Sequence, residues 1–92
     1  MLAVGEFGRS PKINDKAGRE HWEHCYSALV AGGGVRGGRV VGASDARGEH
    51  PRECPLTPAD LAATVHRCVG ITSEQAQTLG VAVNAKVIGE LF

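Results

Sequence analysis

The 92-residue sequence has few aromatic side chains, no excess of charge of either sign and no long hydrophobic run. Two Phe, one Trp and one Tyr stand against thirteen Gly and four Pro, so the chain is rich in loops and poor in large core residues. A chain of this length buries only about 60–65% of the surface that its unfolded form exposes. We therefore expect a single partial domain over residues 1–92, as part of a larger fold.

The balanced charge and the short apolar stretches argue against two kinds of partner, nucleic acid and membrane. Ten basic side chains balance ten acidic ones, without the basic stripe of a nucleic-acid-binding protein. The longest apolar stretches, residues 1–4 and 28–31, fall far short of the roughly 20 residues of a membrane-spanning helix. Gly5 and Glu6 also interrupt the first stretch before it reaches the length of a signal peptide. We expect no nucleic acid, no membrane and no export segment, and the compartment stays unknown.

Cysteine is also scarce, which bears on disulfides and on zinc. The three cysteines are odd in number and contain no Cys-x-x-Cys pair, so we expect reduced thiols rather than a disulfide framework. A small zinc-binding module remains an alternative, although its donors are not arranged as two tight pairs. Its candidate ligands are His21, His24, Cys25, His50 and Cys54.

The first half of the chain predicts strands. Residues 1–5 form an unbroken apolar run that ends at glycine, which is typical of a strand buried in a parallel sheet. Residues 25–43 predict a strand pair, Cys25–Ala31 with Gly38–Ala43, joined by a glycine turn. Residues 44–55 are polar, with a turn expected near Arg47.

The second half predicts one main helix over residues 57–70. Thr57 suits the N-cap, Pro58 the first turn and Gly70 the exit. We expect an apolar stripe on this helix to pack on the sheet. The stripe consists of Leu61, Ala62, Val65, Cys68 and Val69. Residues 71–92 predict a poorly defined tail, with a weaker helix over 73–79.

Two other features have simpler interpretations than a site. Gly32–Gly37 matches G-x-G-x-x-G, but strand-like residues follow it where a dinucleotide loop requires a helix. We interpret this segment as a flexible turn. His66 falls on the predicted helix, and we interpret it as a solvated or half-buried side chain.

Polar chemistry concentrates in the loop of residues 6–24. Glu6 follows the first strand directly, and ligands of α/β sheets bind beyond the carboxyl ends of strands. Arg9, Arg19 and His21 follow within the same loop, and Trp22 gives the imidazole a large apolar neighbour. Imidazole beside apolar surface suits metal binding or acid–base chemistry. A simple salt bridge between Glu6 and Arg9 is the alternative.

Several motifs together resemble one family over most of the chain. They are Gly5–Asn14, Gly18–Trp22, Ala31–Asp45 and Thr57–Val65 with Val69–Ile71. The set is similar to the C-terminal end of the sulfatase-like bacterial proteins grouped as domain of unknown function 1501, within the alkaline phosphatase superfamily. The resemblance implies an α/β fold, the C-terminal portion of an alkaline-phosphatase-like α/β/α sandwich. This chain has Glu20 where the family usually has Asp, and Ser10 where the family usually has Thr.

The resemblance also implies a function. Glu6 and His21 resemble ligands of a divalent metal, which is zinc, calcium or magnesium in the complete protein. Arg9 and Arg19 would bind a small anionic ester, a sulfate or a phosphate. The nucleophile and most metal ligands of such hydrolases precede this segment, so we expect no catalytic residue here and no activity from the chain alone. A non-catalytic structural or interaction remnant of the fold is the alternative.

Overall fold

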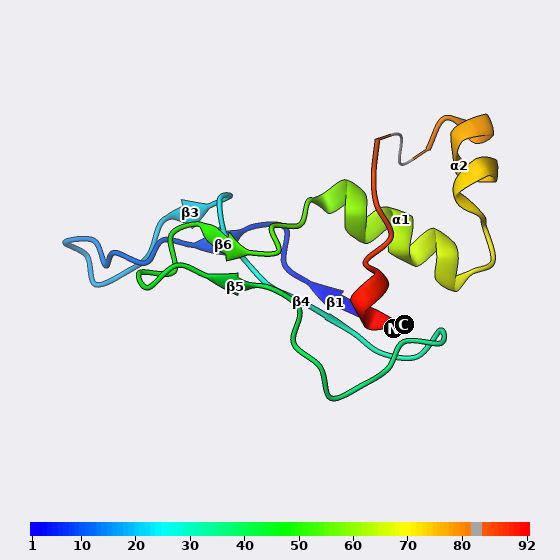
Figure 1. The fold of residues 1–92 in the computed structure, drawn as a ribbon. Coiled ribbons are helices and arrows are strands. Elements are labelled where there is room, and N and C mark those ends of the chain that lie inside the picture. The colour runs from blue at the N-terminus through cyan, green and yellow to red at the C-terminus, as the bar shows by residue number, and fades with distance from the viewer. Residues whose placement is uncertain (82–83) are drawn as a thin grey trace. The chain divides into compact units, whose positions relative to one another are not determined.

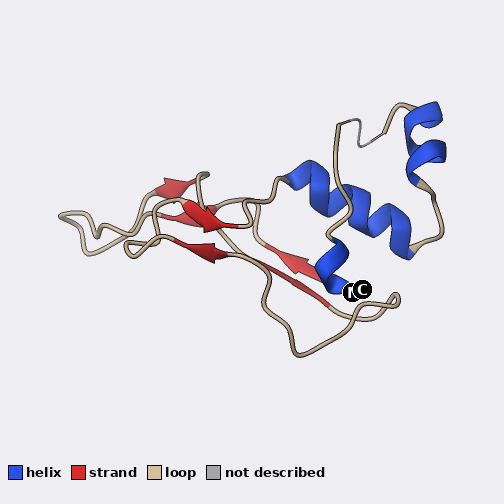
Figure 2. Ribbon diagram, viewed as in Figure 1, coloured by secondary structure: helices blue, strands red, loops and turns tan. Residues whose placement is uncertain are grey.

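The computed structural model describes residues 1–81 and 84–92, so residues 82–83 of the predicted tail lie outside the described residues. Contacts group the chain into two compact units, each built from two separate stretches. Unit 1 comprises Met1–Val30 and Gly42–Pro55, and unit 2 comprises Ala31–Val41 and Leu56–Phe92. Short strands lie in unit 1 and helices in unit 2, which is a mixed α/β composition (Figure 1, Figure 2).

Six short strands form unit 1. They are β1 (Leu2–Val4), β2 (Gly8–Arg9), β3 (His21–Trp22), β4 (Ala28–Val30), β5 (Ala43–Ser44) and β6 (Pro51–Glu53). The strands pair as β1 with β4, β2 with β3 and β5 with β6, all antiparallel and all as two-stranded sheets. Long loops join them (Figure 2). The β2–β3 pair brings together two ends of the loop in which the sequence predicts a site.

β1 is a strand, as the apolar run of residues 1–5 suggests, but the expectation of a buried parallel strand is wrong for this chain. It pairs antiparallel with β4, with Ala3 opposite Leu29. The exposed fractions are 41% for Leu2, 45% for Val4 and 55% for Leu29. Both strands are apolar without alternation, yet within the described residues their sheet has no third strand. A two-stranded sheet of this kind leaves apolar side chains in water.

The predicted pairing of Cys25–Ala31 with Gly38–Ala43 is also wrong. In the first segment, Ala28–Val30 form β4, which pairs with β1. In the second segment, Ala43 belongs to β5 and pairs with Glu53 of β6. The reason lies in the glycines of the second segment, since Gly38 and Gly42 have φ of +72° and +80°. These angles lie outside the β region, so the backbone turns where the valines alone favour a strand.

Unit 2 contains α1 (Pro58–Cys68), α2 (Ser73–Leu79) and a 3-10 helix, η1 (Gly89–Leu91). Thr57 caps α1, accepting a hydrogen bond from the amide of Asp60, whose carboxylate accepts the amide of Thr57 in return. This reciprocal capping box satisfies backbone donors that the first turn leaves unpaired. Thr72 and Gln75 form the same arrangement at α2. α1 therefore begins at the residues that its sequence signals predict.

Two side chains of α1, one turn apart, accept hydrogen bonds from backbone amides of the C-terminal tail. Asp60 Oδ1 accepts the amide of Lys86 at 2.8 Å, and Thr64 Oγ1 accepts the amide of Ile88 at 2.9 Å. Figure 1 shows this tail, in red, running alongside α1. The amide of Lys86 is the largest influence that holds the pKa of Asp60 below its usual value. Ile88 and Leu91 are buried in the same unit.

The residue that α1 buries completely is not one of the predicted apolar stripe. Thr64 is fully buried, whereas Val69 is 68% exposed, and Leu61 and Val65 are half-buried. The hydroxyl of Thr64 donates to the carbonyl of Asp60 at 2.7 Å while accepting the Ile88 amide. A side chain that both donates and accepts can lie under a polar backbone segment, where a valine could not. The tail therefore covers a polar position of the helix.

Candidate functional site

The loop between β2 and β3 is built on Ser10. This side chain is buried, and its hydroxyl donates to the carbonyl of Lys12 and accepts the amide of Glu20, both at 2.9 Å. The Ser10 amide also donates to the Glu20 carbonyl at 2.9 Å, which extends the pairing of β2 with β3 by one step. The hydroxyl therefore holds the two arms of the loop together.

Asn14 forms the tip of this loop. Its Oδ1 accepts the amides of Lys16 and Gly18 at 3.0 and 2.9 Å, and its Nδ2 donates to the carboxylate of Glu20 at 2.7 Å. Asparagine commonly closes turns in this way, because its amide mimics backbone groups. The tip also contains Ala17 at φ +57°. Glu20 is thereby engaged in the loop structure.

The two arginines of the predicted site have different partners. Arg19 Nη1 donates to the carbonyls of Ser10 and Pro11 at 2.8 and 2.7 Å, so this guanidinium braces the loop. Within residues 1–81 and 84–92, the hydrogen bond of the Arg9 side chain is a long one of 3.5 Å to the carbonyl of Arg19, and its guanidinium lies 5.6 Å from the centroid of the Phe7 ring. Arg9 is exposed. The N–H donors of Arg9 are therefore more accessible to an anion than those of Arg19.

His21 lies opposite Arg9 in the register of β2 and β3. Its ring stacks on Phe7, with centroids 4.0 Å apart and planes tilted by 32°. Glu6 directly precedes Phe7 and is exposed, and within the described residues its carboxylate has no hydrogen bond or ion pair. The structure thus brings His21, Arg9 and Phe7 together. Glu6 is placed next to this group along the chain.

Trp22 points to the opposite side of β3 from His21, because successive side chains of a strand alternate. Its indole N–H donates to the carbonyl of Glu49 at 2.8 Å. The rings of His24 and His50 lie 4.8 and 6.1 Å from the indole and 5.3 Å from each other, measured between centroids. This cluster connects β3 to the loop between β5 and β6.

Asp45 organises the β5–β6 loop. Its carboxylate accepts the amides of Arg47, Glu49 and His50 at 3.1, 2.9 and 3.2 Å. Hydrogen bonding of the Glu49 amide is the largest influence on its ionisation and lowers the pKa of Asp45 below the ordinary 3.8. Because a charged carboxylate accepts these bonds more strongly, the ionised form stabilises the folded loop.

Acidification should therefore loosen the β5–β6 loop. With a folded pKa below the unfolded value of 3.8, the contribution of Asp45 is complete above pH 3.8 and is lost as the pH falls through the folded pKa. We expect amide exchange at Glu49 and His50, corrected for intrinsic rates, to accelerate below pH 3.8. Asp45→Asn should produce faster exchange already at pH 6. Equal exchange in the variant and the parent at pH 6 would contradict this role.

The donors proposed for a small zinc module do not form a metal site. Within residues 1–81 and 84–92, no group of three or more His, Cys, Asp or Glu side chains is placed to hold a metal ion. Within the part of the chain that the structure describes, the cysteines form no disulfide. The second alternative therefore has no ligand set in this structure.

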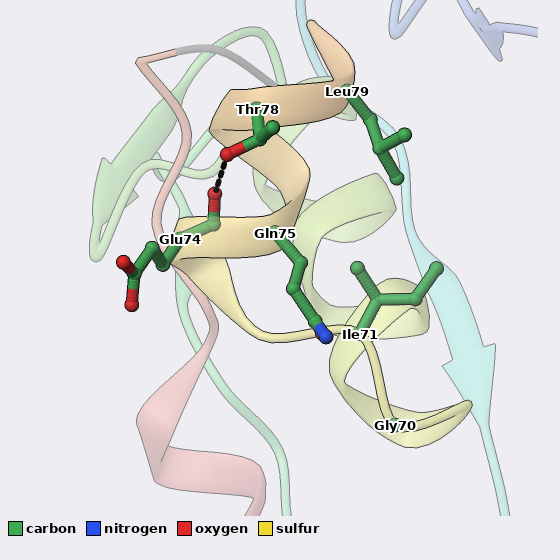
Figure 3. Close-up of a pocket in the computed structure, with 6 residues that line it drawn as sticks. All are labelled: Gly70, Ile71, Glu74, Gln75, Thr78 and Leu79. Atoms are coloured by element: carbon green, nitrogen blue, oxygen red, sulfur yellow. Dashed lines mark hydrogen bonds between the residues drawn. The ribbon is translucent and has the colours of Figure 1, made fainter.

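A separate hollow of about 570 Å³ lies in unit 2, along α2 and the turn before it (Figure 3). It is lined by Gly70, Ile71, Glu74, Gln75, Thr78 and Leu79. In Figure 3 the side chains of Ile71 and Leu79 lie on one side of α2, while the carboxylate of Glu74 points away from them. The hollow contains none of the predicted site residues, and Glu74 is the titratable residue of its lining. Within the described residues, no helix is long and apolar enough to cross a membrane.

The motifs around β2, β3 and α1 place the protein in a known family. A family model described as "Protein of unknown function (DUF1501)" matches residues 1–89, and the chain belongs to this family. Among curated proteins and among solved structures, the comparisons gave no match. The family assignment thus agrees with the resemblance of the sequence motifs.

Sequence reasoning missed the residues that shape the site. Asp45 and Asn14 organise loops through side chain to backbone bonds, and Ser10 is buried between two strands too short to predict. The turn that the sequence predicts near Arg47 is present in the β5–β6 loop, where the amide of Gly48 donates to the carbonyl of Asp45 at 3.1 Å. The two-residue strands β2 and β3 leave no periodicity to detect.

Proposed function

We propose that this chain forms the C-terminal part of a metal-dependent hydrolase of the sulfatase and phosphatase kind, built on an alkaline-phosphatase-like α/β/α sandwich. The observation that carries the proposal is the β2–β3 pairing, which sets Arg9 opposite His21 and stacks the His21 ring on Phe7 at 4.0 Å. Since Glu6 precedes Phe7, residues 6–9 supply a carboxylate and a guanidinium, and the paired strand β3 supplies an imidazole. These are the groups required by a metal site that receives an anionic ester.

The donor set fits a part of a metal site. Glu6 and His21 are a carboxylate and an imidazole, a pairing that suits zinc, while calcium or magnesium would use the carboxylate alone. Two donors are fewer than the three or four protein ligands of a zinc centre. The remaining ligands and the nucleophile would come from other segments, so the isolated chain is expected to be inactive. When bound, the metal would polarise the ester oxygens.

The arginines have different roles in this proposal. Arg9 is exposed and lacks a short hydrogen bond within the described residues, so its guanidinium would bind the sulfate or phosphate group. Arg19 uses Nη1 to brace Ser10 and Pro11. Its other N–H donors would reach the same anion while the loop stays ordered.

The test uses a longer protein of this family that contains this segment, purified without chelators. Glu6→Ala with His21→Ala should lower the bound divalent metal, measured by elemental analysis, while the control pair Glu74→Ala with His66→Gln leaves it unchanged. Arg9→Ala should reduce hydrolysis of para-nitrophenyl phosphate or sulfate about tenfold or more, since a charge-assisted hydrogen bond is lost. Unchanged metal and unchanged hydrolysis would refute the assignment of these residues.

A non-catalytic interaction remnant of the fold is the second candidate. The exposed apolar residues of β1 and β4 favour it, because large apolar patches mark interaction surfaces. Under this alternative the double variant at Glu6 and His21 would leave metal content unchanged. The metal measurement therefore separates the two candidates.

A further inference from the structure

The chain between β4 and β5 contains an exposed segment without regular structure (Figure 2). Within the described residues, the backbone of residues 37–41 makes no hydrogen bond. Val40 is 94% exposed, and Arg39 beside it is exposed as well. A Cβ placed on Gly37 or Gly38 would meet no heavy atom within 4 Å, so the space around the segment is open.

These are the properties of a segment that an endopeptidase can bind. A chain that binds as an added extended strand must offer its backbone hydrogen-bonding groups to the partner, so they cannot already be paired. Exposed loops with small residues are the preferred sites of proteolytic cuts. Gly38 has φ of +72°, and glycine can change from this angle to an extended one at little steric cost.

Arg39 indicates which class of endopeptidase fits. Serine endopeptidases with an acidic group in their specificity pocket select a basic residue before the bond that they cleave. Within the described residues, the Arg39 guanidinium donates from Nη1 to the carbonyl of Glu90 at 3.0 Å, in an exposed position. Water replaces an exposed bond of this kind at little cost, so the side chain can exchange this carbonyl for a carboxylate of the enzyme.

The backbone at every other lysine and arginine is already engaged. Three of these residues lie in strands or helices, four donate their own amide, and two adjoin a group that is bonded to the Ser10 hydroxyl. In this order they are Arg9, Arg52 and Arg67; Lys16, Arg36, Arg47 and Lys86; and Lys12 and Arg19. Cleavage at any of them requires local opening first.

We propose that the Arg39–Val40 peptide bond is a processing site for a serine endopeptidase that cleaves after arginine. The serine oxygen of the enzyme adds to the Arg39 carbonyl carbon, and the bond from this carbon to the Val40 nitrogen breaks. The Val40 nitrogen leaves with a proton as a new amino terminus. Water then hydrolyses the ester on the enzyme and leaves Arg39 with a carboxylate, so the net reaction consumes one water.

The cut leaves the secondary structure whole. The pairs β1–β4 and β2–β3 precede it, while β5–β6, α1 and α2 follow it. The hydrogen bond from Trp22 to Glu49 spans the cut in unit 1, and the bond from the Arg36 amide to the Leu91 carbonyl spans it in unit 2. The product is therefore a two-chain form held by noncovalent contacts. The proposal does not rest on the hydrolase function, since Arg39 has no part in that site.

Limited digestion of the 92-residue chain with trypsin, followed by intact-mass spectrometry, tests the site. The first products should be residues 1–39 and 40–92, with far-ultraviolet circular dichroism unchanged by the cut. Arg39→Gln should slow the first cut about tenfold or more, because the remaining bonds must open locally before they fit the protease. The control Arg47→Gln, at another exposed arginine, should leave the rate of the first cut unchanged.

Arg39→Lys separates loss of recognition from a change in the fold. This variant should still be cut by trypsin at the same bond and should resist an endopeptidase restricted to arginine. A first cut at another position, or an equal rate of first cleavage in Arg39→Gln and the parent, would overturn the processing site. Simultaneous cleavage at many positions would overturn it too, because the segment would then be no more accessible than the rest. Each of these results leaves the metal measurement on Glu6 and His21 unaffected.

Discussion

Thr64→Val lowers the free energy of unfolding by about 1–3 kcal/mol, the cost of leaving a buried hydrogen-bonding group without its partner. The hydroxyl of Thr64 is fully buried, donates to the carbonyl of Asp60 and accepts the amide of Ile88. Valine has nearly the same shape but offers neither group, so the Ile88 amide loses its acceptor inside the unit. Urea unfolding followed by circular dichroism measures the change, and the melting temperature should fall with it.

Thr78→Val is the matched control for this variant. Thr78 also lies on a helix and donates to the carbonyl four residues earlier, that of Glu74, at 3.1 Å (Figure 3). Because Thr78 is exposed, water replaces the lost bond, and we expect a change within about 0.5 kcal/mol. Thr64→Ser, which keeps the hydroxyl, should retain the attachment of the tail. Equal destabilisation by Thr64→Val and Thr78→Val would show that burial of the hydroxyl is unimportant.

Gly8→Ala is expected to disrupt the pairing of β2 with β3. A Cβ at this position would clash with the carbonyl oxygen of Cys25 and would lie 3.0 Å from that of Trp22. Both contacts involve backbone atoms, which cannot rotate away, so the strands must separate. Overpacking of this kind costs about 1–3 kcal/mol and occasionally more. Thermal unfolding measures the loss, and cross-strand nuclear Overhauser effects between Arg9 and His21 should weaken.

Gly37→Ala provides the comparison for the Gly8 variant. A Cβ at Gly37 meets no heavy atom within 4 Å, so added volume alone should have little effect on stability. If Gly8→Ala melts at the same temperature as Gly37→Ala and retains its cross-strand contacts, the close approach of β2 to the chain after β3 does not exist. The same result would weaken the proposed site, since that site depends on Arg9 lying opposite His21.

The sequence allowed the prediction of elements that carry local chemical signals. Thr57, Pro58 and Gly70 delimit α1 within one or two residues, because capping and proline preferences act over a single turn. The range expected for the second helix, residues 73–79, matches α2, Ser73–Leu79, which Thr72 caps. These signals involve residues that are close in sequence, so they can be interpreted without knowledge of the tertiary fold.

Long-range pairings could not be predicted in the same way. Residues 28–30 are equally apolar whether they pair with β1 or with residues 38–43, and only the positive φ of Gly38 and Gly42 separates the two outcomes. The burial of Thr64 depends on a tail that returns from more than twenty positions away. For the candidate site, Glu6, Arg9, Arg19 and His21 are predictions from the sequence. The loop-bracing bonds of Arg19 required the folded backbone.

The interleaving of the two units has a practical consequence for dissecting the protein. Each unit draws on two stretches of chain, and Ala31–Val41 of unit 2 lies between the two stretches of unit 1. No single proteolytic cut or terminal deletion can therefore yield two pieces that each contain one whole unit. A cut after residue 55 would keep both stretches of unit 1 but would separate the two stretches of unit 2, so point substitutions are the sounder way to assign roles to residues.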